Sequence, residues 1–173
     1  MLYIVTPCSR PENLKRISET IPGHATWVVL LDKTVKGFFY SPANISIYSL
    51  RTGSWGHPLR NEFLDLYEES FTDKDWVYML DDDNIFHPAL APRIQDLMNT
   101  SAVMVTWSQG RRLKATTEPA PGKVDTASYM YRPQLGLRYT EAYDADGIFA
   151  QNLTRYGSVD AIDEDLCYYN YLK

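Results

Sequence analysis

Short apolar runs alternate along the chain with segments whose apolar residues recur at helical spacing. Apolar runs of this length, rich in β-branched residues and bounded by Gly, Pro or Asp, are typical of buried strands. They predict strands over residues 2–6, 26–31, 45–50, 76–80, 102–107 and 124–131. The alternation of strands with helices predicts an α/β fold of the Rossmann-like type, with a central, mostly parallel mixed sheet flanked by helices.

The segments between these strands carry helix signals. Ser9 is a candidate N-cap, followed by Pro11 and Glu12 in the first turn of a helix that ends near Pro22. Further helices are predicted from Pro58 to Tyr67, over 88–98, within 142–156 and over 164–172. The stretch 108–123 is polar and rich in Gly, Pro and basic residues, which favours a loop or a short hairpin.

The composition narrows the class of protein. A length of 173 residues suits a single domain over 1–173, and 45% hydrophobic against 23% charged residues excludes global disorder. No apolar run approaches the ~20 residues that span a bilayer, and the start MLYIVTPCSRP does not resemble a signal peptide. Cys8 and Cys167 fit reduced thiols. We therefore expect a soluble cytoplasmic protein with no transmembrane segment. Its net charge of −5 argues against binding of nucleic acid.

The strongest chemical signal is the acidic run Asp81-Asp82-Asp83-Asn84, placed where a hydrophobic strand ends. Ligands of open α/β sheets bind outside the carboxyl ends of strands. Adjacent carboxylates repel one another, and a hard divalent ion such as Mg²⁺ or Mn²⁺ relieves that repulsion through oxygen ligands. The alternative is a solvated acidic turn.

Two further groups of polar residues are candidates. Arg60 and Asn61 fall in the first turns of a predicted helix, where a guanidinium could bind a phosphate, although an exposed Arg paired with a neighbouring acid is an equal alternative. Asp144 and Asp146 precede an apolar helix, and the acids 163–165 begin the last predicted helix. Carboxylates at such positions often only cap the helix. The functional alternative is that Asp165 serves as a general base.

Other catalytic signatures are missing from the sequence. It has no GxSxG elbow, no GxGxxG after the first strand and no Walker GxxxxGK[ST]. Its three histidines, His24, His57 and His87, lack zinc-ligand spacing with either cysteine. These absences leave the acidic run as the centre of any site.

Taken in order along the chain, the motifs resemble those of small GT-A fold glycosyltransferases. YIVTPCSRP is similar to the opening strand and nucleotide-binding turn of that fold, and VVLLD to its second strand. GHPLRNEFL, DDDN and DADGIFAQNL resemble segments of the animal β-1,3-glucuronyltransferases, with DDDN in place of their metal-binding D-x-D. KVDTASYMYRP is similar to the strand that follows in many GT-A enzymes, and AIDEDLCYYN to the x-E-D helix start that carries the base of inverting ones. The chain is also similar to compact glycosyltransferase domains of large DNA viruses.

The resemblance implies a role for each matching residue. Thr6, Pro7, Arg10 and Asp32 would surround the nucleoside, and Arg60 and Asn61 would lie near the diphosphate or the donor sugar. Asp81 and Asp82 would belong to the same nucleotide-sugar site, and Asp83 would bind Mn²⁺ or Mg²⁺. Asp144 and Asp146 would bind acceptor or donor hydroxyls, and Asp165 would be the base, with Glu164 as the second choice.

These roles imply metal-dependent transfer of a sugar from a nucleotide diphosphate donor, with UDP-sugars favoured, to a hydroxyl of a glycan or another acceptor, with inversion. Two alternatives remain open. A nucleotidyltransferase shares the α/β plan and acidic metal ligands, but its first strand normally leads into a Gly-rich, basic loop, whereas TPCSRP contains one Arg and no Gly. A non-catalytic module that binds nucleotide sugars or glycans would need no base.

Overall fold

The sheet has a buried centre, and its two outer strands are more exposed. The computed structural model describes residues 1–36, 42–134 and 136–172. Within them, the seven strands are β1 (Leu2–Cys8), β2 (Thr26–Leu31), β3 (Ile45–Tyr48), β4 (Trp76–Met79), β5 (Met104–Ser108), β6 (Tyr129–Tyr131) and β7 (Val159–Asp165). They form one mixed sheet in the order β3-β2-β1-β4-β6-β5-β7. β6 runs antiparallel to both of its neighbours, and the other paired strands are parallel, which confirms the predicted fold class.

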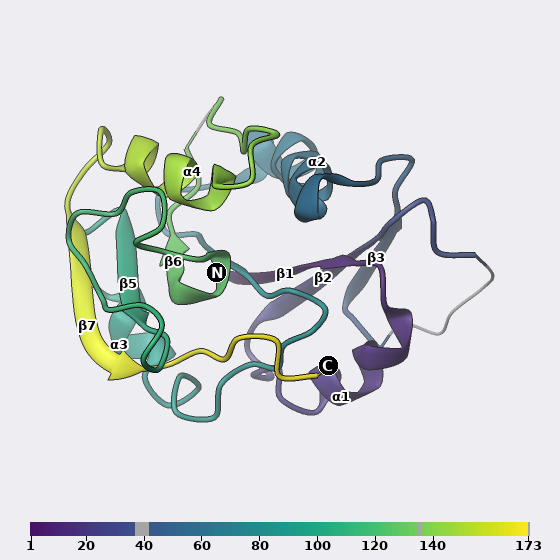
Figure 1. Cartoon of the computed structure of the whole chain (residues 1–173), viewed down its shortest axis with the longest axis horizontal. Helices are drawn as coiled ribbons and strands as arrows, with labels where there is room; N and C mark the ends of the chain where they lie inside the picture. Colours follow the sequence, from purple (N-terminus) through teal and green to yellow (C-terminus); the bar gives the residue numbers. More distant parts are fainter. Residues whose placement is uncertain (37–41, 135, 173) are drawn as a thin grey trace.

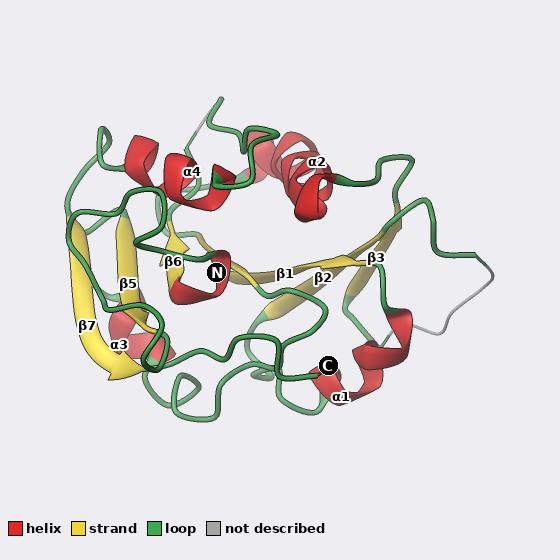
Figure 2. Cartoon of the chain, viewed as in Figure 1, coloured by secondary structure: helices red, strands yellow, loops and turns green. Residues whose placement is uncertain are grey.

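Helices cover both faces of this sheet (Figures 1 and 2). α2 (His57–Tyr67) and α4 (Ala145–Leu153) lie on one face, where Phe63 and Phe149 pack against Val5 and Tyr131. α1 (Leu14–Ser18) and α3 (Ile94–Met98) lie on the other and belong to a second core cluster with the opposite side chains of the strands. Short 3-10 turns, η1 (Pro11–Asn13), η2 (Ser54–Gly56), η3 (Glu68–Ser70) and η4 (Thr126–Ser128), join the larger elements. The result is a three-layer α/β arrangement.

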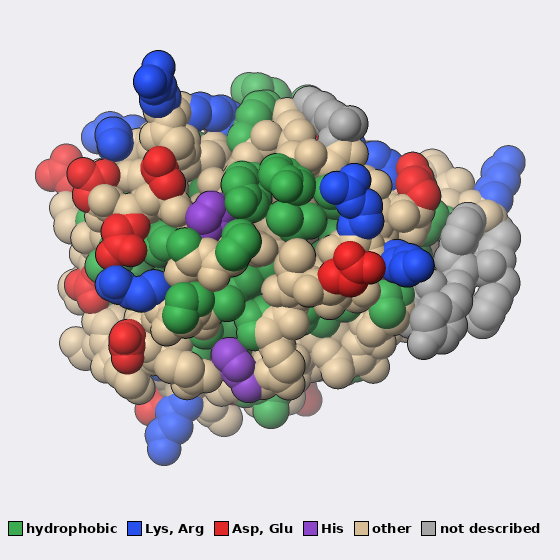
Figure 3. Space-filling view, turned by 90° about the horizontal axis from the view of Figure 1, so that it is seen from below, with side chains coloured by type: hydrophobic (Ala, Val, Ile, Leu, Met, Phe, Trp, Pro, Cys, Tyr) green, Lys and Arg blue, Asp and Glu red, His purple; other side chains and the backbone are tan. Residues whose placement is uncertain are grey.

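The segment after β7 returns across the α1 and α3 side of the sheet (Figure 1). The backbone N–H of Leu172 donates to the carbonyl of Asp83 at 2.7 Å, and that of Tyr171 donates to Asn84 Oδ1 at 3.2 Å. The last residues described are therefore fixed to the end of β4. The face seen from this side gathers hydrophobic side chains near its centre (Figure 3). Every helix in the described parts of the chain is too short or too polar to cross a membrane.

Two predictions about local structure were wrong. The acids 163–165 do not begin a helix over 164–172, because they are the last residues of β7, which pairs in parallel with β5. Ser9 does not cap the first helix, because Arg10 occupies the cap position and the Ser9 hydroxyl donates instead to Asp82 at 3.0 Å. The other predicted strands and helices are present, several of them shorter than expected.

Candidate functional site

A cavity of about 440 Å³, which we call the switch-point cavity, opens where β1, β2 and β4 end. From β1 the chain moves outward to β2 and β3 and then returns to form β4 on the other side of β1. Such a reversal of strand order leaves a crevice at the carboxyl ends of the strands, the usual ligand site of open α/β sheets. Of the residues predicted from the sequence, Pro7, Arg10, Asp32, Asp81, Asp82 and Asp83 line this cavity.

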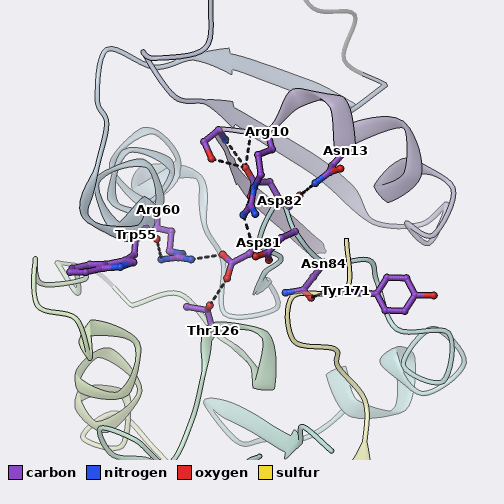
Figure 4. A network of polar contacts seen from close by, with 11 residues as sticks. Arg10, Asn13, Trp55, Arg60, Asp81, Asp82, Asn84, Thr126 and Tyr171 are labelled. Carbon is purple, nitrogen blue, oxygen red and sulfur yellow. Dashed lines mark hydrogen bonds and ion pairs between the residues drawn. The ribbon is translucent and has the colours of Figure 1, made fainter. Parts of the chain in front are cut away.

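Asp82 ties the end of β4 to the turn after β1 (Figure 4). Its Oδ2 accepts from the backbone N–H groups of Ser9 at 2.6 Å and of Arg10 at 2.8 Å, and its Oδ1 accepts from Arg10 Nε at 2.9 Å. Asn13 Nδ2 donates to the Asp82 carbonyl at 2.8 Å. A carboxylate that is only 3% exposed and accepts this many bonds is a structural anchor of the cavity wall.

Asp83 lies next to the same guanidinium, with Arg10 Nη2 at 3.2 Å from its Oδ2. Within the described ranges, no three Asp, Glu, His or Cys side chains come together as a complete set of metal ligands. Mg²⁺ and Mn²⁺ often need only one or two carboxylates when a phosphate ligand supplies further oxygens. A divalent ion here would therefore have to share its ligands with a bound phosphate, and Asp83 is the carboxylate that could contribute.

Asp81 and Arg60 form an ion pair that connects β4 to the start of α2 (Figure 4). Arg60 is 3% exposed, and its Nη1 also donates to the Trp55 carbonyl at 2.9 Å. Desolvation raises the pKa of Asp81, Arg60 lowers it, and the negative charges of Asp125 and Asp83 raise it further, with a net upward shift. The repulsion means that a cation or a hydrogen-bond donor bound here would stabilise the ionised carboxylate.

His57 begins α2 beside this pair. Burial and the charge of Arg60 lower the pKa of His57 to about 4. Arg60 Nη1 lies 2.7 Å from His57 Nδ1, and a guanidinium can only donate, so Nδ1 accepts and the proton sits on Nε2. Among the described residues, the buried Nε2 finds no hydrogen-bond partner of good geometry. His57 is thus a neutral hydrogen-bond donor at neutral pH.

Asp32 directly follows β2 and lines another part of the switch-point cavity. Its Oδ1 accepts from Thr34 N at 2.8 Å, Thr34 Oγ1 at 2.7 Å and Thr52 Oγ1 at 2.7 Å. Burial alone would raise the pKa of Asp32, but these hydrogen bonds outweigh it and hold the pKa below its ordinary value. Asp32 is therefore an ionised acceptor that closes the cavity over β2.

A smaller cavity of about 200 Å³, which we call the side cavity, adjoins the first between α2, α4 and η4. Trp55, Asp81, Asp125 and Tyr169 line both cavities, so the two are contiguous. The predicted residues that line the side cavity are Arg60, Asp81, Asp144 and Asp146.

Asp146 stands in the first turn of α4 and faces this smaller space. Burial, with a contribution from Asp125, raises the pKa of Asp146 to about 6. Its Oδ1 accepts from the backbone N–H of Gly147 at 2.9 Å, which keeps the carboxyl in place. Gly147 itself packs so closely on Pro121 that an added Cβ would lie 2.4 Å from Pro121 Cα. α4 therefore holds a carboxyl with a raised pKa against the cavity.

Four predicted residues lie elsewhere. Thr6 is fully buried and accepts from Trp27 Nε1 at 3.0 Å, and Asn61 is bonded through both side-chain ends to the backbone of Tyr139, each at 2.8 Å. Glu164 is exposed and pairs with Arg93 at 3.1 Å, and Asp165 is exposed at the end of β7. Neither acid lines either cavity. The role of Asp165 as a base stays a prediction.

Sequence reasoning missed Asp125 and Trp55. Asp125 forms a capping box with Ser128 and an ion pair with Arg112 at 2.7 Å. The pattern D-x-x-S directly before a strand carried that local signal. The backbone of Trp55 has φ +53° and ψ +31°, and its ring meets that of Tyr143 at 5.4 Å. Only the glycines on either side of Ser54-Trp55 hinted at an unusual turn there.

Neither a family model nor a curated protein sequence matches the chain. Solved structures with the same fold do match. One is 4-diphosphocytidyl-2C-methyl-D-erythritol synthase, with a TM-score of 0.51, 15% identity, and coverage of 85% of this chain and 84% of that one. Another is a putative glucose-1-phosphate thymidylyltransferase from Bacillus anthracis in complex with a sucrose, with a TM-score of 0.53, 12% identity, and coverage of 95% and 87%.

A weaker match is a glycosyltransferase involved in the glycosylation of the major capsid of PBCV-1. Its TM-score is 0.46 at 11% identity, with coverage of 86% of this chain and 65% of that one. At these identities the two stronger matches establish the fold alone. The chain has the Rossmann-like α/β fold that those two proteins share.

Proposed function

We propose that the protein is a metal-dependent glycosyltransferase that moves a sugar from a nucleotide diphosphate sugar, with UDP-sugars favoured, to a hydroxyl of a glycan or another acceptor. The observation that carries the proposal is the continuity of the two cavities. The switch-point cavity has the position of a nucleotide site, and it leads into a side cavity lined by Asp144 and Asp146. Carboxylates suit the hydroxyl groups of a sugar or an acceptor.

A nucleotidyltransferase is the main alternative, because a protein with the same fold is a putative thymidylyltransferase. Enzymes of that kind need free backbone N–H groups after the first strand to bind a triphosphate. In this chain the N–H groups of Ser9 and Arg10 are already bonded to Asp82. This favours a donor whose diphosphate oxygens bind Arg10 and a cation that Asp83 would hold.

The metal would be held by Asp83, with Asp81 close by and the diphosphate completing the ligands. When bound, such an ion neutralises charge on a diphosphate leaving group. Arg10 bridges Asp82 and Asp83 through Nη2, so the cation would replace part of this ion pair. Arg10 would then be available to bind a phosphate oxygen.

The transfer itself forms a bond from the acceptor oxygen to the anomeric carbon and breaks the bond from that carbon to the diphosphate. A single displacement of this kind inverts the anomeric centre, and the acceptor proton passes to a carboxylate. The sequence points to Asp165 for this role, with Glu164 second, but both lie outside the cavities. We place the base on Asp146, because it lines the side cavity and its pKa of about 6 is close to the optimum for a base at neutral pH.

A thermal-shift screen of nucleotide sugars with and without Mn²⁺ tests the donor site. A ligand at 100 times its Kd stabilises the native state by about 2.7 kcal/mol, which corresponds to roughly 5–10 °C for a chain of this size. Asp83→Asn should lose the metal-dependent part of the shift, whereas Asp96→Asn, at an exposed acid on α3, should keep it. Absence of any shift across uridine, thymidine, guanosine and cytidine diphosphate sugars would refute the proposal.

Nucleotide diphosphate release with a panel of saccharide acceptors then separates an enzyme from a binding module. Asp146→Asn should lower turnover by about 10²–10⁴-fold with donor affinity retained. The same change at Asp165 is the matched comparison, and the larger loss identifies the base. Release of pyrophosphate from a nucleoside triphosphate and a sugar 1-phosphate would instead establish the nucleotidyltransferase. Donor binding without turnover under any of these conditions would establish the binding module.

A further inference from the structure

Trp55 is an exposed tryptophan on a strained backbone. Its φ of +53° lies in the left-handed region, which is uncommon for a bulky side chain. The conformation is held by Arg60, which donates to the Trp55 carbonyl, and by Gly56, which packs closely against Pro7. The other three tryptophans are at most 2% exposed, whereas Trp55 is 62% exposed. Strain of this kind concentrates at ligand sites, so the fold holds this ring in place for contact with something outside the chain.

The exposed ring stands at the junction of the two cavities, because Trp55 lines both. It meets Tyr143, which precedes α4 and is 79% exposed, edge to face with an interplanar angle of 81°. Figure 4 shows the indole on the Arg60 side of the polar network, away from Arg10 and Asp82. Asp32, which directly follows β2 and would contact the nucleoside, lines the switch-point cavity but not the side cavity.

The charges of the side cavity limit what can bind there. Arg60 is paired with Asp81, and Arg112 with Asp125, which leaves the carboxylates of Asp144 and Asp146 without an arginine partner in the side cavity. Asp144 occupies the N-cap of α4, yet its side chain makes no capping hydrogen bond. The cavity therefore offers acceptors for hydroxyl groups and repels an additional carboxylate.

We propose that Trp55 and Tyr143 form the surface against which the sugar ring of the donor lies, and that this sugar is a neutral hexose and not a uronic acid. The inference rests on the proposed function and adds the class of sugar. A pyranose presents an apolar C–H face that suits an indole, and hydroxyls at its edge that suit Asp144. A volume of about 200 Å³ is below the ~300–1,000 Å³ of pockets for drug-sized ligands, so it fits a single ring. The acidic lining separates this chain from the glucuronyltransferases that its motifs resemble.

Acrylamide quenching of tryptophan fluorescence tests the contact directly, because only Trp55 among the four tryptophans is open to solvent. The probes are UDP, UDP-glucose, UDP-galactose and UDP-glucuronate, each with Mn²⁺, and their binding is measured separately by calorimetry. A ring stacked on one face of the indole should lower the quenching constant about twofold. We expect this protection from a neutral UDP-sugar and not from UDP, and about tenfold weaker binding of UDP-glucuronate, equal to 1.4 kcal/mol.

Two variants separate the ring from the fold. Trp55→Gly removes the ring and suits the left-handed backbone, so thermal stability should be kept while the affinity for the UDP-sugar falls to that for UDP. Tyr143→Ala should weaken the UDP-sugar and leave UDP unchanged. Tyr156→Ala, at a tyrosine that is 51% exposed and lines neither cavity, should change neither affinity.

The outcomes keep this inference apart from the function on which it rests. Equal protection by UDP alone would place Trp55 against the nucleobase and overturn the proposal, with the donor site intact. Binding of UDP-sugars without protection, or preference for UDP-glucuronate, would also overturn it. If none of the UDP probes bound in calorimetry, the proposal that UDP-sugars are the donors would be refuted, and the assignment of the sugar would be refuted with it.

Discussion

Replacing Asp146 with Asn should stabilise the fold at pH 7. The carboxyl is held in the first turn of α4 with its pKa raised from 3.8 to about 6 by burial and by Asp125. Folding therefore makes this group harder to ionise. Below pH 3.8 the carboxyl is protonated in both the folded and the unfolded state, and its burial carries no charge penalty. This contribution to the free energy of unfolding is lost as the pH rises through 6.

The size of the effect follows from the two pKa values. Their difference corresponds to about 3 kcal/mol at 1.36 kcal/mol for each tenfold change. Partial exposure of the side chain reduces this, and an anion at a helix N-terminus gains about 0.3–1 kcal/mol that the amide would lose. We therefore expect a gain of about 1–2 kcal/mol at pH 7 and almost none at pH 4. The amide oxygen that Asp146→Asn introduces could still accept from Gly147, so the turn should be preserved.

Urea denaturation followed by circular dichroism at both pH values measures this difference. Asp144→Asn is the matched control, because Asn serves as well as Asp at an N-cap and this side chain makes no capping bond. A variant at position 146 that is destabilised at pH 7, or that gains equally at pH 4, would refute the reasoning. A gain in stability together with lost turnover would show that the carboxyl is kept for chemistry at a cost to the fold.

Three other changes test the framework of the site. Gly56→Ala should lower the free energy of unfolding by about 1–3 kcal/mol, because its φ is +81° and the new Cβ would lie 2.9 Å from Pro7 Cβ. Gly53→Ala is the control, since it has a similar φ of +82° in open space and should cost less. Equal losses of stability in thermal denaturation would contradict the packing argument. Asp82→Ala should cost about 1–3 kcal/mol, seen as a fall in Tm, since it leaves the partly buried N–H groups of Ser9 and Arg10 unpaired; no measurable loss would show that the anchor is dispensable. In the Asp146→Asn background, the free energy of unfolding should fall as the pH drops from 6.5 toward 4, because folding lowers the pKa of His57 to about 4 and the unfolded chain therefore binds the proton more readily. His57→Gln should remove this pH dependence. An unchanged pH dependence in that variant would assign it to another group.

The sequence was most informative where one local pattern determines one element. β1, β2 and β4 are built on short apolar runs that are followed by Pro7, Asp32 and Asp81, and burial on both faces of a parallel sheet favours such runs. The acids after β4 follow from the same logic, since strand ends meet at the ligand edge of the sheet. The position of the switch-point cavity at this edge could therefore be predicted from the sequence.

Pairing between distant segments was not accessible. The acids 163–165 have the composition of a helix start, yet the parallel register with β5 draws them into β7. Asp82 could not be distinguished from Asp81 and Asp83 by composition, because its role depends on Arg10, which is 72 residues away in the chain. Asp125 carried only the signal of a capping box, which indicates local structure, whereas tertiary packing places its side chain in the lining of both cavities.

The acids of β7 acquire a different meaning from their place in the sheet. β7 is one outer strand of the described sheet, and an open edge can recruit strands from other molecules. Asp163, Glu164 and Asp165 are exposed along its end. A second copy that added its own β7 there would bring acids opposite acids, which repel across paired strands. The charge that the sequence suggested for catalysis thus opposes the pairing of two β7 edges in which these acids face one another.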